Sequence, residues 1–275
     1  MDHHASAVAL AFLRKKFPFI AFMLNFLKNA SEAIMAILEF ISDDDFLKEV
    51  ENLLSKARAQ KTKAEKTFNR NVIDPFGALF EAQSFPSHLA WRNSEMARQR
   101  QKTIQNHVGT FHQKILGHVE GWEDMNIGSI IDLVNKDKKI IAEVKNKYST
   151  VTGGDLAGTY QALSELVSPK HSGFKGYCSY FVNIIPKKTE RFDKPFTPSD
   201  KKIGSLCPIN ENIRIIDGAS FYSLVTGRFN ALREMHNALP DAIEFISHDR
   251  FKEDHYVLPN REDFMQYFNL AYGDE

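Results

Sequence analysis

The sequence predicts an α/β fold in which helices flank a mixed central β-sheet, preceded by a helical N-terminal portion. Residues 130–147 contain two short apolar runs around the polar turn 135–138, which is typical of a β-hairpin. Stretches on both sides repeat their apolar residues every three or four positions, as amphipathic helices do. Further runs rich in β-branched and aromatic residues follow at 177–185 and 213–216. Strands interspersed with helices favour a sheet whose faces are covered by helices.

The composition is that of an ordinary globular protein. Of the 275 residues, 43% are hydrophobic and 25% are charged, which excludes wholesale disorder. The formal net charge is +0, so any affinity for nucleic acid must come from local basic patches. Only two cysteines occur, Cys178 and Cys207, and neither has a metal-ligand neighbour. Two isolated thiols fit a reducing cytoplasm, and we therefore expect a cytoplasmic protein.

The N-terminal region differs in composition from the rest. Residues 7–27 are apolar, but three basic residues at 14–16 divide them, and the piece 17–27 is shorter than the ~20 residues of a membrane span. We expect no membrane association. An amphipathic pattern begins at Met35, which favours residues 1–34 as an extension outside the fold, although an integral helix is the alternative. Residues 35–275 are expected to form one domain, with a helical part (35–120) and a catalytic α/β core (about 93–245).

The helical part contains two long amphipathic segments. The first begins at the capping residue Ser42, has Phe46 and Val50 on one face, and runs into the basic stretch 56–70. That stretch is either a solvated face or a surface that meets phosphates. After a turn at 74–77 and a short apolar piece, the second helix is expected over 93–119.

Several elements follow the hairpin. Thr152 and Asp155 have the spacing of a capping box and predict a helix start. Residues 186–208, rich in Pro and Lys, are expected to be a long functional loop between two strands. A helical region should then run from Gly218 through Leu239, and a last helix should begin after Asn260.

Acidic side chains inside the predicted hairpin indicate chemistry. Alternation places Glu143 and Lys145 on one face of a strand, about 7 Å apart, and the partner strand can bring Asp132 beside Glu143. Two neighbouring carboxylates repel unless a proton or cation lies between them, and one lysine cannot balance both. Mg²⁺ prefers one or two carboxylates together with water and phosphate oxygens. The pattern favours metal-dependent hydrolysis of phosphodiesters, with an incidental ion pair as the alternative.

The same residues resemble a known superfamily. Asp132, ten residues, and then Glu143-Val-Lys145 resemble the PD-(D/E)XK nuclease core, except that Ile131 replaces the proline before the aspartate. Other segments, from residue 36 to the C-terminus, are similar to type II restriction endonucleases that cut GGNCC-type sites, including GGWCC. These segments are DPFGALFEA (74–82), GTFHQKILG (109–117), DLVN (132–135), EVKNKYSTVTGGD (143–155), PFTPSD (195–200) and DGASFYSLVTG (217–227).

The resemblance implies roles for individual residues. Asp132 and Glu143 would be metal ligands for Mg²⁺, and Lys145 would be the catalytic lysine. Gln113, in the preceding helix, is a weaker candidate for supporting the site, with a surface glutamine as the alternative.

Further residues are candidates for contacting DNA because of their position and charge. Asn146 and Lys147 lie beside a helix start at Gly153 and Gly154, where backbone N–H groups attract phosphate, although an ordinary helix cap explains them equally well. Basic side chains of the 186–208 loop could read guanine edges in a groove. They are Arg191, Lys194, Lys201 and Lys202.

The expected function is that of a type II restriction endonuclease that cuts double-stranded DNA. A palindromic site would require a homodimer with twofold symmetry, and a cognate DNA methyltransferase would be its genetic partner. Two alternatives remain at this point: a nuclease of repair or recombination with the same core, and a nucleic-acid-binding protein without enzymatic activity.

Overall fold

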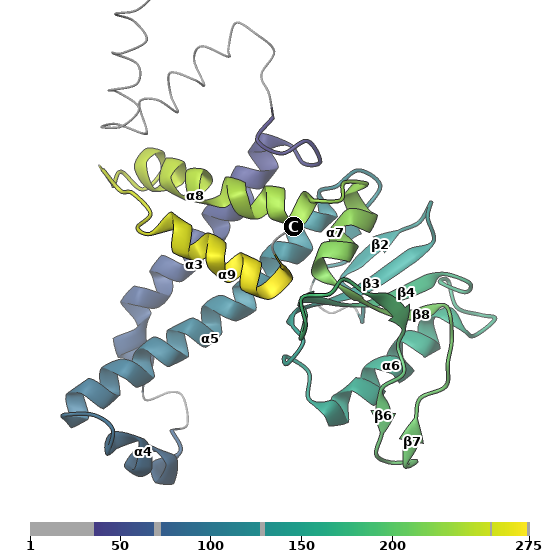
Figure 1. Cartoon of the computed structure of the whole chain (residues 1–275), viewed down its shortest axis with the longest axis horizontal. Helices are drawn as coiled ribbons and strands as arrows, with labels where there is room; N and C mark the ends of the chain where they lie inside the picture. Colours follow the sequence, from purple (N-terminus) through teal and green to yellow (C-terminus); the bar gives the residue numbers. More distant parts are fainter. Residues whose placement is uncertain (1–35, 69–72, 127–129, 254, 274–275) are drawn as a thin grey trace, which may run out of the picture.

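The computed structural model describes residues 36–68, 73–126, 130–253 and 255–273, and it joins a central sheet to a layer of helices (Figure 1). The predicted extension 1–34 and Met35 lie outside the described residues. One sheet has six strands in the order β1-β2-β3-β4-β8-β5, and β6 and β7 form a separate pair. The strands are β1 (Glu123–Asp124), β2 (Leu133–Asn135), β3 (Ile140–Lys147), β4 (Cys178–Ile185), β5 (Asp193–Pro195), β6 (Ser199–Asp200), β7 (Ser205–Leu206) and β8 (Ile213–Asp217).

The sheet is mixed, as the sequence predicts. Strands β3, β4 and β8 run parallel, whereas β1, β2 and β5 pair antiparallel with their neighbours. The expected hairpin is β2–β3, in which Leu133 pairs with Ala142. Parallel strands need helices on both faces, and this requirement is met here.

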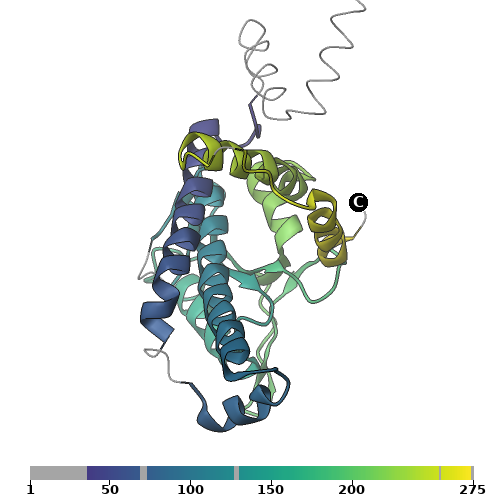
Figure 2. The same cartoon turned by 90° about the vertical axis from the view of Figure 1, so that its left-hand side faces the viewer.

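The helices form two groups. Figure 2 shows α3 and α5 lying side by side, with α4 at their far end. Helix α6 covers one face of the sheet, and α7 lies on the other, with α8 and α9 beyond it (Figure 1). The helices are α3 (Asp43–Thr67), α4 (Pro75–Ala82), α5 (His88–Gly117), α6 (Gly153–Val167), α7 (Gly218–Thr226), α8 (Ala231–Asp249) and α9 (Arg261–Tyr272).

Each face of the sheet has its own apolar core. Against α6 lie Ile141 of β3 and Phe181 of β4, together with Tyr160 and Leu163 of the helix itself. The opposite core takes the alternate strand residues, such as Val144 and Val182, and packs them against α3, α5, α7 and α8. Alternation therefore decides which side chain of β3 faces which layer.

Three expectations about elements are wrong in part. The segment 186–208 is not one loop: β5 pairs with β8 at the sheet edge, and β6 pairs with β7. The helical region after Gly218 is two helices, and α8 continues past Leu239 through Pro240 to Asp249. The apolar piece after the turn at 74–77 belongs to α4, which starts at Pro75 behind the cap Asp74.

The continuation of α8 has a physical reason. Proline removes one helical hydrogen bond and clashes with the preceding turn. Met235 before the proline and Ala242 and Ile246 after it are buried in the core. Packing on both sides of Pro240 therefore lets the helix continue through the proline. The capping of α3 by Ser42 is confirmed. The helix predicted over 93–119 begins earlier, at His88, and the predicted capping box of α6 is wrong in detail, because the Thr152 hydroxyl donates to the Asp155 side chain and caps no backbone N–H.

Candidate active site

Asp132 and Glu143 lie side by side at the open end of the β2–β3 hairpin. The last pair of the ladder is Leu133 with Ala142, and Asp132 and Glu143 are the next residues outward on the two chain segments. The Asp132 N–H donates to the Ala142 carbonyl oxygen (2.8 Å), and the Val144 N–H donates to Asp132 Oδ2 (2.7 Å). The backbone of β3 therefore holds the Asp132 carboxylate directly beside Glu143.

The alternation of β3 explains why these charges face α6. Ile141 is fully buried under α6, while Ala142 and Val144 belong to the opposite core. Glu143 and Lys145 project from the same face of β3 as Ile141. They lie closer to the carboxyl end of the strand, past the apolar core under α6. There the Lys145 ammonium forms an ion pair with Glu143, and both side chains are partly exposed.

Electrostatics at this site favours an added positive charge. Burial raises the pKa of Glu143 to about 7, the Asp132 carboxylate adds to that rise, and Lys145 opposes it. Burial also raises the pKa of Asp132, although the Val144 N–H and Lys145 act against the rise. One lysine does not offset the charge of two partly buried carboxylates, so a second positive charge would stabilise the pair.

The donor set fits a hard divalent cation. Oxygen ligands from one or two carboxylates are what Mg²⁺ takes from proteins, the rest being water or phosphate oxygens. Within the part of the chain that the structure describes, no three His, Cys, Asp or Glu side chains gather as a metal site. Asp132 and Glu143 are therefore a pair of carboxylates that would leave most of the coordination of a cation to water or phosphate oxygens.

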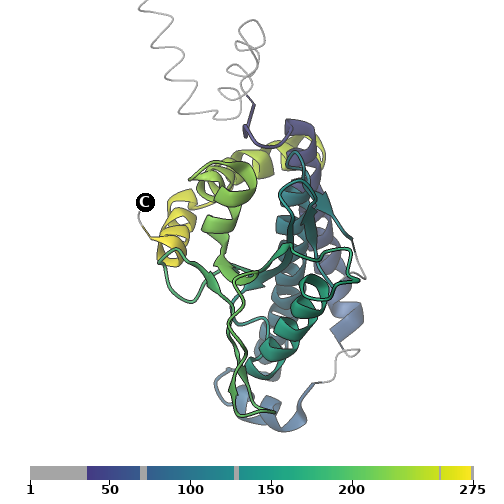
Figure 3. The ribbon, with the colours of Figure 1, turned by 90° about the vertical axis from the view of Figure 1, so that its right-hand side faces the viewer.

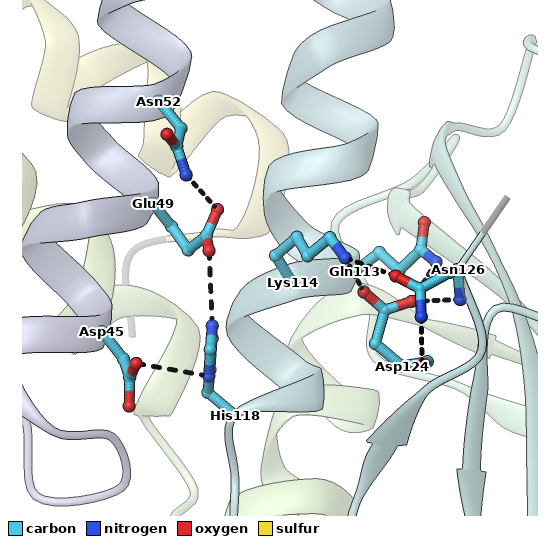
Figure 4. Close-up of polar contacts among 8 residues, drawn as sticks. All are labelled: Asp45, Glu49, Asn52, Gln113, Lys114, His118, Asp124 and Asn126. Atoms are coloured by element: carbon cyan, nitrogen blue, oxygen red, sulfur yellow. Dashed lines mark hydrogen bonds and ion pairs between the residues drawn. The ribbon is translucent and has the colours of Figure 1, made fainter.

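Gln113 lies on the other face of the sheet edge, where it holds Asp124 (Figure 4). Its Nε2 donates to Asp124 Oδ1 (2.7 Å), and Lys114 Nζ lies 2.5 Å from Asp124 Oδ2. Burial alone would raise the pKa of Asp124, but the Lys114 ammonium, the Asn126 N–H and Gln113 together lower it. The Asp124 charge adds to the rise in the Asp132 pKa. The structure thus brings Gln113 to Asp124, a residue that no sequence motif pointed to, and within the described residues Gln113 makes no hydrogen bond to Asp132 or Glu143.

A cavity of about 380 Å³ lies between α3 and α5 on the same face as Asp124. His118 lines this cavity and contacts α3, with its Nε2 3.3 Å from Glu49 Oε1 and its Nδ1 3.6 Å from Asp45 Oδ1 (Figure 4). Lys48, Lys56 and Lys114 also line it. Neither Asp132 nor Glu143 does, so this cavity is separate from the carboxylate pair.

The residues proposed to bind phosphate divide between two faces. The Asn146 side chain points toward α5, where its Nδ2 donates to the Gln105 carbonyl oxygen (3.3 Å). Lys147 is exposed at the end of β3. Gly153 and Gly154 form the first turn of α6, behind the N-cap Thr152. The structure thus leaves Lys147 accessible at the carboxyl end of β3 and turns Asn146 away from Glu143 and Lys145.

The four basic residues of the 186–208 segment do not form one cluster. The Arg191 guanidinium donates to Ser223 Oγ (3.1 Å) and the Phe229 carbonyl oxygen (2.9 Å), and it stacks on the Phe229 ring. Lys194 lies on β5, with Nζ 5.4 Å from the Phe192 ring centre. Lys201 and Lys202 are exposed in the turn between β6 and β7.

None of the described helices combines the length and apolarity needed to cross a membrane.

Comparison with known proteins identifies close relatives. The sequence model of a family described as Eco47II restriction endonuclease matches residues 38–247. The chain is 67% identical over 239 residues to the type II restriction enzyme Eco47II of Escherichia coli, covering 87% of this chain and 100% of the relative. It is also 30% identical over 220 residues to the type II restriction enzyme Sau96I of Staphylococcus aureus, covering 75% of this chain and 80% of that relative.

Proposed function

Because the chain belongs to the Eco47II family of type II restriction endonucleases, which are site-specific deoxyribonucleases, we propose that Asp132, Glu143 and Lys145 form its hydrolytic site. Asp132 and Glu143 hold Mg²⁺, and Lys145 serves the attack on the phosphodiester. The observation that carries this assignment is the pair of neighbouring, partly buried carboxylates, with the pKa of Glu143 raised to about 7.

Each residue has a separate task in the proposed reaction. A divalent cation held by Asp132 and Glu143 would supply positive charge for the scissile phosphate and would lower the pKa of the attacking water. The Val144 N–H fixes the Asp132 carboxylate, so this ligand is oriented before substrate arrives. Lys145 Nζ, free to leave Glu143 at the rim of the site, orients the attacking water and stabilises the charge of the pentavalent transition state.

The proposed substrate is double-stranded DNA with a short palindromic GGNCC-type site, as expected from the segments that resemble enzymes cutting such sites. A palindrome is read by two protomers related by a twofold axis, each cutting one strand, so the proposed active species is a homodimer. A DNA methyltransferase that protects the same site is the proposed genetic partner.

A plasmid digest tests the reaction itself. Supercoiled plasmid incubated with the protein should give discrete fragments with Mg²⁺ and none with chelator, and sequencing the fragment ends gives the site and the cut position. Smearing or nicking would instead indicate a nuclease without site specificity.

Amide variants test the residues. Asp132→Asn and Glu143→Gln should each lower the cleavage rate by about 100-fold or more, because a metal ligand contributes several kcal/mol to the transition state. Binding to site-containing DNA should survive in a gel-shift assay. Asp137→Asn, in the exposed turn of the same hairpin, is the matched control and should cut normally.

A thermal melt separates this assignment from a structural ion pair. Because burial and Asp132 disfavour the charged form of Glu143, Glu143→Gln should melt at or above the wild-type temperature without metal at pH 8. Loss of a stabilising ion pair would lower the melting temperature instead. A folded Glu143→Gln protein that cuts at the wild-type rate would exclude the assignment.

A further inference from the structure

Asn183 lies toward the carboxyl end of β4, and its side-chain oxygen has no hydrogen-bond partner in the described part of the chain. Its side chain is 6% exposed, and its Oδ1 is buried with no hydrogen-bond partner among the described residues. Buried polar atoms in folded proteins nearly always have a partner, because leaving one unpaired is destabilising. The Asn183 amide oxygen is therefore available to accept a hydrogen bond from a neighbouring donor.

The register of the sheet shows which donor is near. Lys145 of β3 pairs with Asn183 of β4, and Asn183 pairs with Asp217 of β8. Residues directly across from each other project from the same face, with neighbouring strands about 4.8 Å apart. Asn183 therefore stands beside the stem of Lys145, on the face that carries Glu143.

Asp217, the neighbour of Asn183 on β8, already has hydrogen-bond partners for both carboxylate oxygens. Asp217 Oδ1 accepts from the Ser220 N–H (2.9 Å), and Oδ2 accepts from the Phe192 N–H (2.6 Å), so this carboxylate caps α7 and ties down the segment before β5. As a carboxylate it has no hydrogen to donate to Asn183 Oδ1. Of the two residues paired with Asn183, only Lys145 has N–H groups in its side chain that can donate a hydrogen bond to Oδ1.

We propose that Asn183 is a positioning residue for Lys145: its Oδ1 accepts a hydrogen bond from Lys145 Nζ once Glu143 turns to a divalent cation. The inference rests on the proposed function of Asp132 and Glu143. Without metal, Lys145 pairs with Glu143. When a cation takes the Glu143 carboxylate, it also repels the ammonium, which then needs another acceptor. Asn183 supplies an oxygen on the same face, one strand away.

The amide suits this task better than an acid would. The negative charges of Asp132 and Glu143 are not fully balanced by nearby positive charge, and the pKa of each carboxyl is raised. A carboxylate at position 183 would add a third negative charge to the same face. An amide offers an acceptor oxygen without that charge, and its place on a central strand keeps it fixed.

A metal-binding experiment without DNA tests the contact independently of cleavage. Mg²⁺ is titrated into the full chain, and the rise in melting temperature gives the apparent affinity. Asn183→Leu, which keeps the volume but removes the oxygen, should weaken this affinity by about 10-fold, the value of a hydrogen bond to a charged group. In a Lys145→Met background the same substitution should have no effect, because the donor is gone.

Cleavage then shows whether the contact serves the reaction. Asn183→Leu should lower the single-turnover cleavage rate by about 10- to 100-fold with little change in DNA affinity. Asn183→Asp keeps the oxygen and should cut faster than Asn183→Leu. Ser179→Ala is the matched control: Ser179 lies on the same strand and face, at the opposite end, and bonds only the Asn212 carbonyl oxygen.

Each outcome decides the inference. An equal effect of Asn183→Leu with and without Lys145, or a leucine variant as active as wild type, overturns the contact. An aspartate variant no better than leucine overturns the role of the oxygen. These results would leave the Asp132 and Glu143 assignment intact, whereas active Asp132→Asn or Glu143→Gln proteins would remove the premise itself.

Discussion

His112 and Tyr222 form a buried hydrogen bond that ties α5 to α7. The His112 Nδ1 lies 2.8 Å from the Tyr222 hydroxyl, and that hydroxyl also lies 3.6 Å from Met235 Sδ. Burial lowers the pKa of His112 to about 4, so the imidazole stays neutral in the folded protein. The histidine is therefore a structural residue whose proton affinity differs between the folded and unfolded states.

This difference predicts a pH dependence of stability. Above pH 6.5, His112 is neutral in both states and has no effect. As the pH falls from 6.5 to about 4, the unfolded chain takes up a proton that the folded protein refuses, and about 3 kcal/mol of stability is lost. The free energy of unfolding of His112→Gln, measured by urea denaturation, should fall less steeply than that of wild type across this range. Parallel curves for the two proteins would contradict the assignment.

At the scale of elements, the sequence predicts what local patterns encode. The β2–β3 hairpin follows from alternation and a polar turn, and with it the meeting of Asp132 and Glu143. Helix α4 escapes prediction because none of its side chains is buried, so its sequence has no inward face to detect. Strands β5 to β7 are two or three residues long and exist through pairing with distant segments. The position of Asn183 beside Lys145 depends on the register between β3 and β4, which no local pattern shows.

One glycine controls the junction of β8 with α7. A Cβ atom on Gly218 would lie 2.3 Å from the Ile184 carbonyl oxygen of β4, which is backbone and cannot rotate away. Gly218→Ala should therefore destabilise the protein by about 2 kcal/mol, as overpacked sites do.

The matched control, Gly158→Ala, is expected to change stability in the opposite direction. Gly158 lies inside α6, and a Cβ atom added there would have no neighbouring atom within 4 Å, so Gly158→Ala should stabilise the helix by about 0.5–1 kcal/mol. Urea denaturation of both variants measures the two shifts. A stable Gly218→Ala protein would show that α7 can move away from β4 without penalty.

At the scale of the whole molecule, the β6–β7 hairpin projects from the sheet alongside α6 (Figure 3). Its base is anchored, since the Tyr160 hydroxyl of α6 donates to the Pro208 carbonyl oxygen (2.9 Å) and Phe196 stacks on Phe181 of β4. Its turn carries the exposed Lys201 and Lys202. A firmly held hairpin with basic residues at its tip is suited to reach into a groove of DNA.

We predict that these two lysines contribute to site selection. Lys201→Ala and Lys202→Ala should each reduce the preference for the correct site over sites with one changed base pair by about 10-fold, the value of a lost base contact. Cleavage rates on matched oligonucleotide duplexes measure this preference. Lys175→Ala, an exposed lysine outside the hairpin, is the control.

The alternative for the same lysines is contact with phosphates only. Binding to all sequences would then weaken equally, and the slope of log affinity against log salt would fall by about 1 for each lysine. Unchanged preference in both variants together with that smaller slope would move base recognition to another part of the protein.

The order of strands in the sheet has a consequence for biosynthesis. Asp132 and Glu143 meet in a local hairpin, but the strands that back it, β4 and β8, come later in the chain, and β8 ends at Asp217. Parallel pairing of distant segments is slow, because the intervening chain must be ordered first. On the ribosome the hairpin therefore emerges before the strands that extend it into the full sheet. The proposed hydrolytic site is therefore incomplete until β8 has been made, which is expected to keep the chain from cutting DNA for most of its own synthesis.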